Sequence, residues 1–597
     1  MKKRNKTWAW LSAIGFAVLA MGQGAFADEP IPSERRLPKN VVAYLSLRDV
    51  AEFKSQWSKT LFGQMVDDDA LADFRADLLK HFNEASEKIE SQLGLGLSDL
   101  LSIPHGEIAA AGLVLPGGKL SGVLFLDFGD RQETVQKLID KASESLSENH
   151  KRTEEEVDDT KIIAYQAEGE EGKKPQAAAA YFMKDSFLVI GTHVAALKEV
   201  LKRWDGRHDQ TLADNETYHY ILDKCRDETS DARPQFVWYL NPVTLAQSAV
   251  ASLPQLPAQV GMAMGVIPII GLDKFKGAGG TLDMAHGEFD TVSRTLIVLD
   301  RSNQGIVNAF QFDTAAMTPP KWLSSDWSGY MAINWNAAKA YSTVETLVDM
   351  LVGPGTLGNQ VQNLADNQLG GIHLKKDVTD QLTGMFHIIE DDGASGGKSA
   401  AEGILYAIQI KNAAAARATL AKLAGLPGVK ITEREFQGET LYEMETAGGD
   451  DDDDDEAGSG KMGLVVTEGN VMIATDVRLL ERVLRGVGDR ETLADSAAYK
   501  HIARKFPAKT NSIGYNRQDT QLKDITDAMK SGQLNVYLTA LTGGFDFFGL
   551  FDFSSVDFSK LPDFDSLKKY MPPSGSFMEQ DARGLKITSF SLRSESD

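Results

Sequence analysis

The sequence predicts an α+β protein built from two tandem copies of one mixed unit, in which helices pack on one face of an antiparallel sheet. Two observations carry this prediction. Short motifs occur twice along the chain at matching spacing, and within each half strand-like runs joined by short turns interleave with helix-like runs. The chain of 597 residues is also longer than one core usually organises, which favours two or more domains.

The N-terminus has the pattern of a secretory signal peptide. Four basic residues precede an apolar stretch from Trp8 to about Met21, which is followed by Ala25-Phe-Ala27. A basic start, a short apolar core and small residues at the end favour cleavage after Ala27. The stretch is shorter than the ~20 residues that span a bilayer, which argues against a membrane anchor. We therefore expect residues 1–27 to be a signal peptide and the chain to be periplasmic or secreted.

The following residues mix strands and helices without a regular rhythm. Val123–Phe128 and Ser186–Ile190 are rich in β-branched and aromatic residues, as expected of strands. A short turn at Met183–Ser186 indicates an antiparallel hairpin. Helices are predicted over Glu133–Leu146 and from Val194 onward, where apolar residues recur with a period near 3.6.

The repeat is clearest at one four-residue motif. Thr211–Asp214 and Thr492–Asp495 both read Thr-Leu-Ala-Asp, and each is followed by a Tyr and an Ile at the same spacing. Upstream, the strand that contains Tyr44 corresponds to the strand that contains Tyr330. We expect a first copy over 28–316, a stiff Pro-containing connector over 317–321 and a second copy over 322–597.

Each predicted copy carries a polar insert between two strands. One insert is Glu168–Pro175, and the other begins at Gly448 and runs through an acidic stretch. The two inserts share little except polarity, which is typical of exposed hairpin tips.

Charge narrows the classes of partner. The formal net charge is −23, and loss of the four basic residues of the signal peptide would take it to −27. So acidic a chain repels phosphate, which argues against nucleic acids and anionic lipids as partners. No later stretch is apolar and unbroken enough to span a membrane, because the closest one, Val260–Leu272, is broken by Gly261, Gly265 and Pro268.

The repeated Thr-Leu-Ala-Asp motif is the most conspicuous candidate site, but its pattern also fits a helix cap. A Thr followed three residues later by an Asp can satisfy free N–H groups at the start of a helix. Such a cap stabilises a fold by ~0.5–2 kcal/mol, which is reason enough for both copies to carry it. We therefore interpret Thr211–Asp214 and Thr492–Asp495 as caps rather than catalytic groups.

An acidic run offers weak candidates for cation binding. Calcium sites need oxygen ligands at staggered positions with a turn residue among them, and a run of adjacent carboxylates lacks that spacing. A solvated loop is the better interpretation, with loose cation association as the alternative. The candidates are Asp450, Asp451, Asp452, Asp453, Asp454, Asp455 and Glu456.

No other constellation of catalytic or cofactor-binding residues stands out. Cys225 is the only cysteine and lies on a predicted helix, which favours a small buried side chain over a reactive thiol. The histidines are scattered without zinc-ligand spacing, and no phosphate-binding glycine loop is present. Trp322, Trp327 and Trp335 gather at the start of the second copy, where packing is favoured over sugar stacking. We expect no cofactor and no catalytic set.

Several segments resemble one exported bacterial family. Leu37–Tyr44, Met317–Trp322 and Tyr570–Ser574 with the strand after it are similar to segments of the domain of unknown function 3352, common in planctomycete-type bacteria. The resemblance spans most of the chain after residue 27 and implies export and a duplicated α+β body. It supplies no catalytic residues.

The sequence therefore favours an exported cell-envelope protein that acts as a non-enzymatic binding or assembly module with an unknown envelope or extracellular partner. Two alternatives remain. One is a hydrolase whose site lies in the cleft between the two copies, and the other is a cation-responsive matrix protein that uses the run from Asp450 to Glu456.

Overall fold

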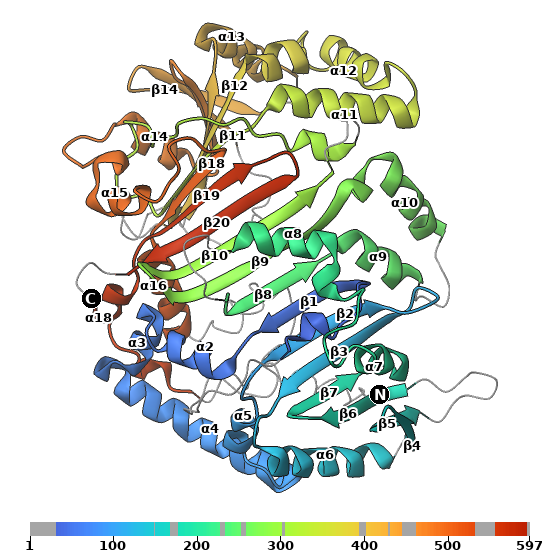
Figure 1. Ribbon diagram of the computed structural model, residues 1–597. Helices are drawn as coiled ribbons and strands as arrows, with labels where there is room; N and C mark the ends of the chain where they lie inside the picture. Colours follow the sequence, from blue (N-terminus) through green and yellow to red (C-terminus); the bar gives the residue numbers. More distant parts are fainter. Residues whose placement is uncertain are drawn as a thin grey trace.

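The computed structural model shows an α+β protein organised around one antiparallel sheet (Figure 1). The predicted signal peptide and both polar inserts, including Asp450–Glu456, lie outside the described residues. The structure describes residues 31–148, 150–167, 177–226, 233–251, 258–300, 305–392, 402–427, 430–444, 461–531 and 556–593.

The sheet has twenty strands among the described residues, and every pairing is antiparallel, as predicted. In the N-terminal half, the neighbours run in the order β4 (His150–Val157), β5 (Thr160–Ala167), β6 (Ala177–Lys184), β7 (Phe187–Gly191), β3 (Leu120–Asp127), β2 (Ile108–Val114), β1 (Val41–Leu47), β8 (Phe236–Leu240), β9 (Phe275–His286) and β10 (Phe289–Leu299).

The C-terminal half continues the same sheet. Its order is β20 (Gly584–Leu592), β19 (Ser574–Gln580), β18 (Ser512–Asn516), β11 (Gly329–Asn334), β12 (Leu382–Asp392), β13 (Glu402–Ile410), β17 (Asn470–Ala474), β16 (Met462–Val466), β15 (Glu439–Met444) and β14 (Ile431–Phe436). β10 pairs with β20 from Phe289 opposite Leu592 to Val298 opposite Gly584, so the sheet crosses between the halves without a break.

Helices connect the strands and cover them. In the first half these are α2 (Val50–Trp57), α3 (Leu61–Asp67), α4 (Ala72–Leu93), α5 (Leu97–Ser102), α6 (Gln132–Ser147), α7 (Val194–Leu201), α8 (Glu216–Cys225), α9 (Pro242–Ala251) and α10 (Ala258–Ile269). In the second half they are α11 (Ala337–Val352), α12 (Thr356–Asn367), α13 (Ala413–Ala424), α14 (Val477–Leu484), α15 (Ala497–Ala503), α16 (Gln518–Lys530) and α18 (Phe564–Leu567).

Helices lie on both faces of the sheet, so the prediction that they pack on one face is wrong. Phe125 on β3 is buried in the core that includes α7, whereas its neighbour Leu126 is buried in the core that includes α6. Successive residues of a strand point to opposite faces, so both faces of β3 are covered. In the second half, Leu441 and Tyr442 on β15 divide in the same way between the cores of α14 and α13.

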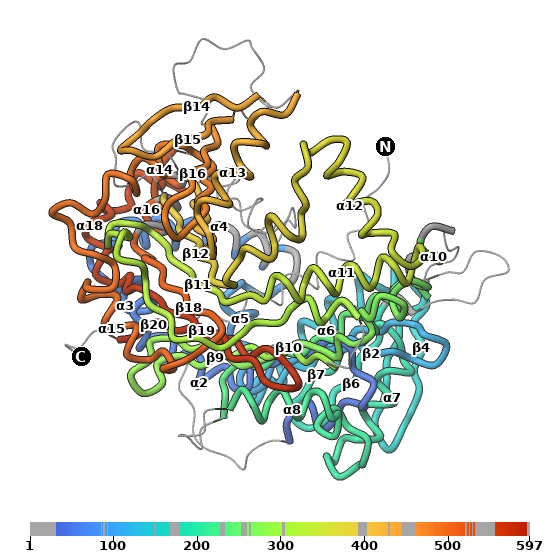
Figure 2. Tube along the Cα trace, turned by 90° about the horizontal axis from the view of Figure 1, so that it is seen from above, coloured from blue at the N-terminus to red at the C-terminus, as the bar shows by residue number. Residues whose placement is uncertain are grey.

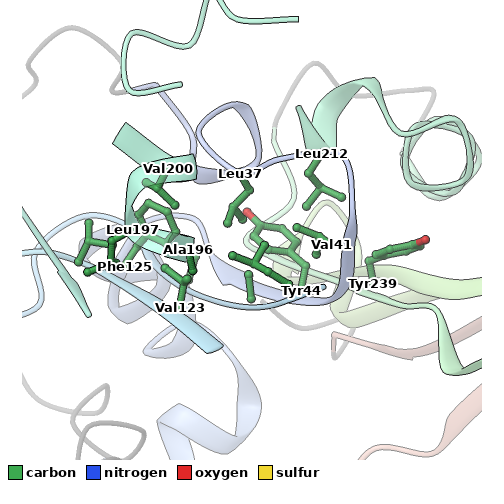
Figure 3. Packing of buried hydrophobic residues seen from close by; sticks show 14 of the residues in the cluster. Leu37, Val41, Tyr44, Val123, Phe125, Ala196, Leu197, Val200, Leu212 and Tyr239 are labelled. Carbon is green, nitrogen blue, oxygen red and sulfur yellow. The ribbon is translucent and has the colours of Figure 1, made fainter. Parts of the chain in front are cut away.

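The main core of the first half surrounds the central strand β1. Figure 3 shows Leu37 and Leu212 close to Tyr44 and Val41. All four side chains are buried, and Leu37 and Leu212 have no exposed surface. The second half has a separate main core that includes Tyr330, Leu323 and Leu493.

Besides the two main cores, a smaller contact joins α3, near the start of the described chain, to α18, near its end. Both views place α18 beside α3 (Figures 1 and 2). Met65 and Leu71 are buried there with Leu567. Asp68 accepts hydrogen bonds from Lys569 at 2.7 Å and from the Tyr570 hydroxyl. We call this contact, made by residues 65–77 and 556–571, the terminal clasp.

Candidate functional site

The repeated Thr-Leu-Ala-Asp motif forms a single 3-10 turn in each half. The Asp214 carboxylate accepts from the Thr211 backbone N–H at 2.9 Å and from its hydroxyl at 2.7 Å, and these bonds lower the pKa of Asp214. Asp495 accepts from the Thr492 hydroxyl at 2.7 Å in the same way. The motif therefore has a structural role.

The motif caps its own 3-10 helix, Leu212–Asp214 or Leu493–Asp495, as predicted, but it does not cap the longer helix that follows. The Asn215 side chain accepts from the N–H groups of Thr217 and Tyr218 at the start of α8. Ser496 takes the same place at the start of α15 and accepts from the Tyr499 N–H at 3.2 Å. One residue separates the turn from each helix, and that residue, Asn215 or Ser496, caps the helix.

The most concentrated group of buried polar residues lies beside β1 and was missed from sequence. Glu107 is only 4% exposed, and its carboxylate accepts from the Ser33 N–H at 2.8 Å and from the hydroxyls of Ser33 and Ser46 at 2.7 Å each. Burial raises the pKa of Glu107. The signal that could have found it is a lone Glu directly before the apolar strand Ile108–Val114.

A second carboxylate and two further groups complete this cluster. Glu34 forms an ion pair with Arg48 and accepts from the Tyr44 hydroxyl at 3.1 Å. Arg48 also lies 3.8 Å from Glu107. Burial, and then Glu34, raise the pKa of Tyr44 well above its usual value. We call Ser33, Glu34, Tyr44, Ser46, Arg48 and Glu107 the Glu107 cluster.

The Glu107 cluster brings two carboxylates and a phenol together, as some catalytic sites do, but its oxygens are already engaged by the protein. Ser33 and Glu34 belong to a short 3-10 turn, Ser33–Arg35, that precedes the first strand. The next residue, Arg36, places its guanidinium 4.0 Å from the ring centroid of Trp204 and 4.5 Å from that of Phe187. The arrangement fastens residues 33–36 to the sheet.

The corresponding place on β11 carries a histidine rather than acids. The Tyr330 hydroxyl lies 3.1 Å from Nδ1 of His387, and the ring of Trp322 packs edge-on against the imidazole. Burial lowers the pKa of His387 to about 4, so the ring is neutral near pH 7. Trp327 is 2% exposed, and Trp335 donates to the Ala309 carbonyl oxygen at 2.8 Å, so this Trp group packs against the protein.

Cys225 and the remaining candidates offer no reactive group. Cys225 has no exposed surface, and burial raises the pKa of its thiol to about 12. A thiolate is therefore disfavoured at this position. Among the described residues, no group of three or more His, Cys, Asp and Glu side chains is placed to hold a metal ion.

Two open grooves flank α7 on the surface of the first half. One, of about 500 Å³, lies between α7 and the β4–β5 hairpin and is lined by Thr153, Glu154, Glu155, Ile162, Ala164, Gln166, Val194, Ala195 and Lys198. The other, of about 410 Å³, lies between α7 and the start of β1 and includes Lys39, Asn40, Leu115 and Arg203. Both contain Ala195, so α7 separates two neighbouring hollows.

The geometry defines an α+β protein whose Glu107 cluster is buried and whose two grooves beside α7 are open to the surface. Residues 356–534 match the family described as Protein of unknown function (DUF3352). The match runs from the start of α12 past the end of α16 and supports the resemblance over that part of the chain. No curated protein and no solved structure matches the chain. None of the described helices is long and apolar enough to cross a membrane.

Proposed function

We propose that the chain is an exported protein of the bacterial cell envelope, periplasmic or secreted, that acts as a non-enzymatic binding or assembly module. The observation that carries this proposal is a contrast between the buried polar groups, which are bonded to the protein itself, and the open grooves on the surface. The buried ones, such as Glu107 and His387, are occupied in holding the fold. The open grooves instead lie beside surface residues of α7.

We also propose that the module arose by tandem duplication, with copies over 28–316 and 322–597 joined by 317–321. Strand pairing supports this, because β1 lies between β2 and β8 as β11 lies between β12 and β18. The register agrees as well, since Tyr44 faces Tyr239 and Tyr330 faces Tyr515.

Export and binding are tested together on the full chain. The protein is expressed with its N-terminus intact in a Gram-negative host, cells are fractionated, and the N-terminus of the recovered protein is sequenced. We expect a periplasmic or secreted protein that begins at Asp28. A cytoplasmic protein that still begins at Met1 would contradict export.

The mature chain is then chemically cross-linked in the envelope fraction, and the partners are identified. A reproducible macromolecular partner is expected. A panel of ester, glycoside and peptide substrates tests the hydrolase alternative, which enzyme-like turnover would establish in place of the binding module. Calcium titration of the chain with and without residues 448–456 tests the matrix alternative, and two coincident curves would exclude it.

A further inference from the structure

The groove between α7 and the β4–β5 hairpin has a counterpart in the second half that is filled. Thr153 on β4 faces Ala164 on β5, while Arg434 on β14 faces Leu441 on β15. Both hairpins sit under a helix of eight residues, α7 and α14. The cross-strand pair is therefore Thr and Ala in the first half, and Arg and Leu in the second.

The larger residues occupy the space beneath α14. Arg434 donates to Glu443 at 2.8 Å and to Glu481 on α14 at 2.7 Å. Its guanidinium lies 5.5 Å from the ring centroid of Phe436. Thr153 and Ala164 have no such reach, and the groove of about 500 Å³ lies at this place in the first half. The second half thus shows that the space suits a basic side chain with an aliphatic stem.

The open groove lies beside a sheet edge. Among the described residues, β4 pairs only with β5, and the two join through Asp158 and Asp159, both with positive φ (46° and 58°). A two-residue turn of this kind makes Val157 and Thr160 a hydrogen-bonded pair. Alternate residues of β4, namely Arg152, Glu154 and Glu156, therefore direct their backbone N–H and C=O groups away from β5.

The edge is acidic and accessible. Glu154, Glu155 and Glu156 are consecutive and exposed, and successive side chains of a strand alternate in direction. Glu155 forms an ion pair with Lys198 across the groove, and Glu154 pairs with Arg152 at 2.7 Å. The side chains in both pairs are at least 36% exposed, so a competing cation can displace either partner at little cost.

We propose that the β4 edge and this groove bind an extended basic segment of a partner protein. The segment adds a strand to β4 through backbone hydrogen bonds, and a Lys or Arg side chain enters the groove with its stem on Ile162 and its charge at Glu155. Residues next to it meet Glu154 and Glu156 on the other face.

This inference rests on the binding role proposed above, and a defined peptide tests it. A fluorescent peptide of eight residues that alternates Lys and Val is titrated with the mature chain, and binding is followed by anisotropy. An alternating Glu–Val peptide and a Lys–Val peptide with Pro at alternate positions serve as controls. We expect binding of the basic peptide alone, because Pro removes the N–H groups that a ladder needs.

Two kinds of variant locate the site. Ala195 is exposed on α7 and lines the groove, so Ala195→Trp fills the groove without changing charge. Glu155→Gln with Glu156→Gln removes two charges from the β4 edge, and Glu433→Gln with Glu435→Gln removes two from β14. We expect the first two variants to weaken binding roughly tenfold or more, and the β14 control to change it less than about twofold.

Equal weakening by the β4 and β14 variants would overturn the inference, since it would indicate attraction to the net charge alone. Binding of the Pro-containing peptide as tight as that of its parent would also overturn it, and so would no binding of the basic peptide. Thermal melts confirm that each variant is folded. A partner cross-linked in the envelope at another surface would leave the module role intact while refuting this site.

Discussion

The central strands β1 and β11 solve the same packing problem with different polar partners. Each places a tyrosine opposite another tyrosine on the partner strand, β8 or β18, and a third tyrosine lies on the helix that precedes that strand. The ring centroids of Tyr218 and Tyr239 are 5.7 Å apart, as are those of Tyr499 and Tyr515. The hydroxyl of Tyr44 meets acids of the Glu107 cluster, whereas that of Tyr330 meets a neutral imidazole. Similar backbone frames thus carry polar cores that respond to different perturbations.

The largest loss of stability is expected when the polar cluster beside Tyr44 in the first half is disrupted. Glu107→Ala removes the acceptor of the Ser33 N–H and of the Ser46 hydroxyl. It also removes one of the two carboxylates beside Arg48, which keeps its ion pair with Glu34. Removing one partner of a buried ionic network costs ~3–5 kcal/mol. We expect a loss of that size in the free energy of unfolding, measured by urea denaturation.

An exposed acid on the outer strand of the second half provides the control. Glu433→Ala should change the same free energy by less than ~0.5 kcal/mol, as surface substitutions usually do. Glu107→Gln, which keeps the shape and one acceptor oxygen, should fall between the two. If Glu107→Ala were as mild as Glu433→Ala, the cluster would not be holding residues 33–36.

The second half should respond to pH through His387. Its folded pKa of about 4 lies below the 6.5 of a free imidazole. As pH falls below about 6.5 the unfolded chain binds a proton that the folded chain excludes, so stability is lost down to about pH 4. The shift corresponds to ~2–3 kcal/mol between pH 7.5 and 4.5.

Denaturant midpoints of the wild type and of His387→Gln at those two pH values isolate this contribution. Burial raises the pKa of Glu107, so protonation of Glu107 favours the folded state as pH falls. This contribution is opposite in sign to that of His387, and it is the same in the wild type and in the variant. We expect the variant to lose less stability on acidification. Equal losses in the two proteins would show that His387 is not the group that titrates.

Particular residues show what the sequence could and could not predict. The α+β class and the antiparallel pairing followed from local patterns, because β-rich runs joined by short turns leave few alternatives. The covering of both faces did not follow, since it depends on which helix meets Phe125 and which meets Leu126. The Glu107 cluster was equally out of reach, because Ser33 and Glu107 are 74 positions apart and only the fold brings them together.

A smaller effect should come from a feature that the two halves share. Asn215→Ala and Ser496→Ala each remove the side chain that accepts the free N–H groups of the following helix. The loss of such a cap costs ~1 kcal/mol. We expect similar losses in the two variants by urea denaturation. If Asn215→Ala did not change the free energy of unfolding, Asn215 would not be the residue that caps α8.

The smallest effect concerns the terminal clasp, in which residues of the two halves are in contact. Asp68 accepts from Lys569 and Tyr570, and these hydrogen bonds hold its pKa well below the usual range. The Lys569 side chain is 63% exposed, so the charged part of the contact is open to screening. We therefore expect Asp68→Asn to lower the thermal midpoint slightly at low salt.

The effect should shrink near 1 M salt, where the screening length falls to ~3 Å. Lys141→Gln is the matched control, because it breaks an ion pair with Glu144 that lies entirely within α6. If the clasp couples the halves, calorimetry of Asp68→Asn should resolve two transitions at low salt while the control keeps the profile of the wild type. The pH-sensitive transition of the variant would then belong to the half that contains His387. Unchanged profiles in both variants would mean that the Asp68 contacts do not couple the two halves.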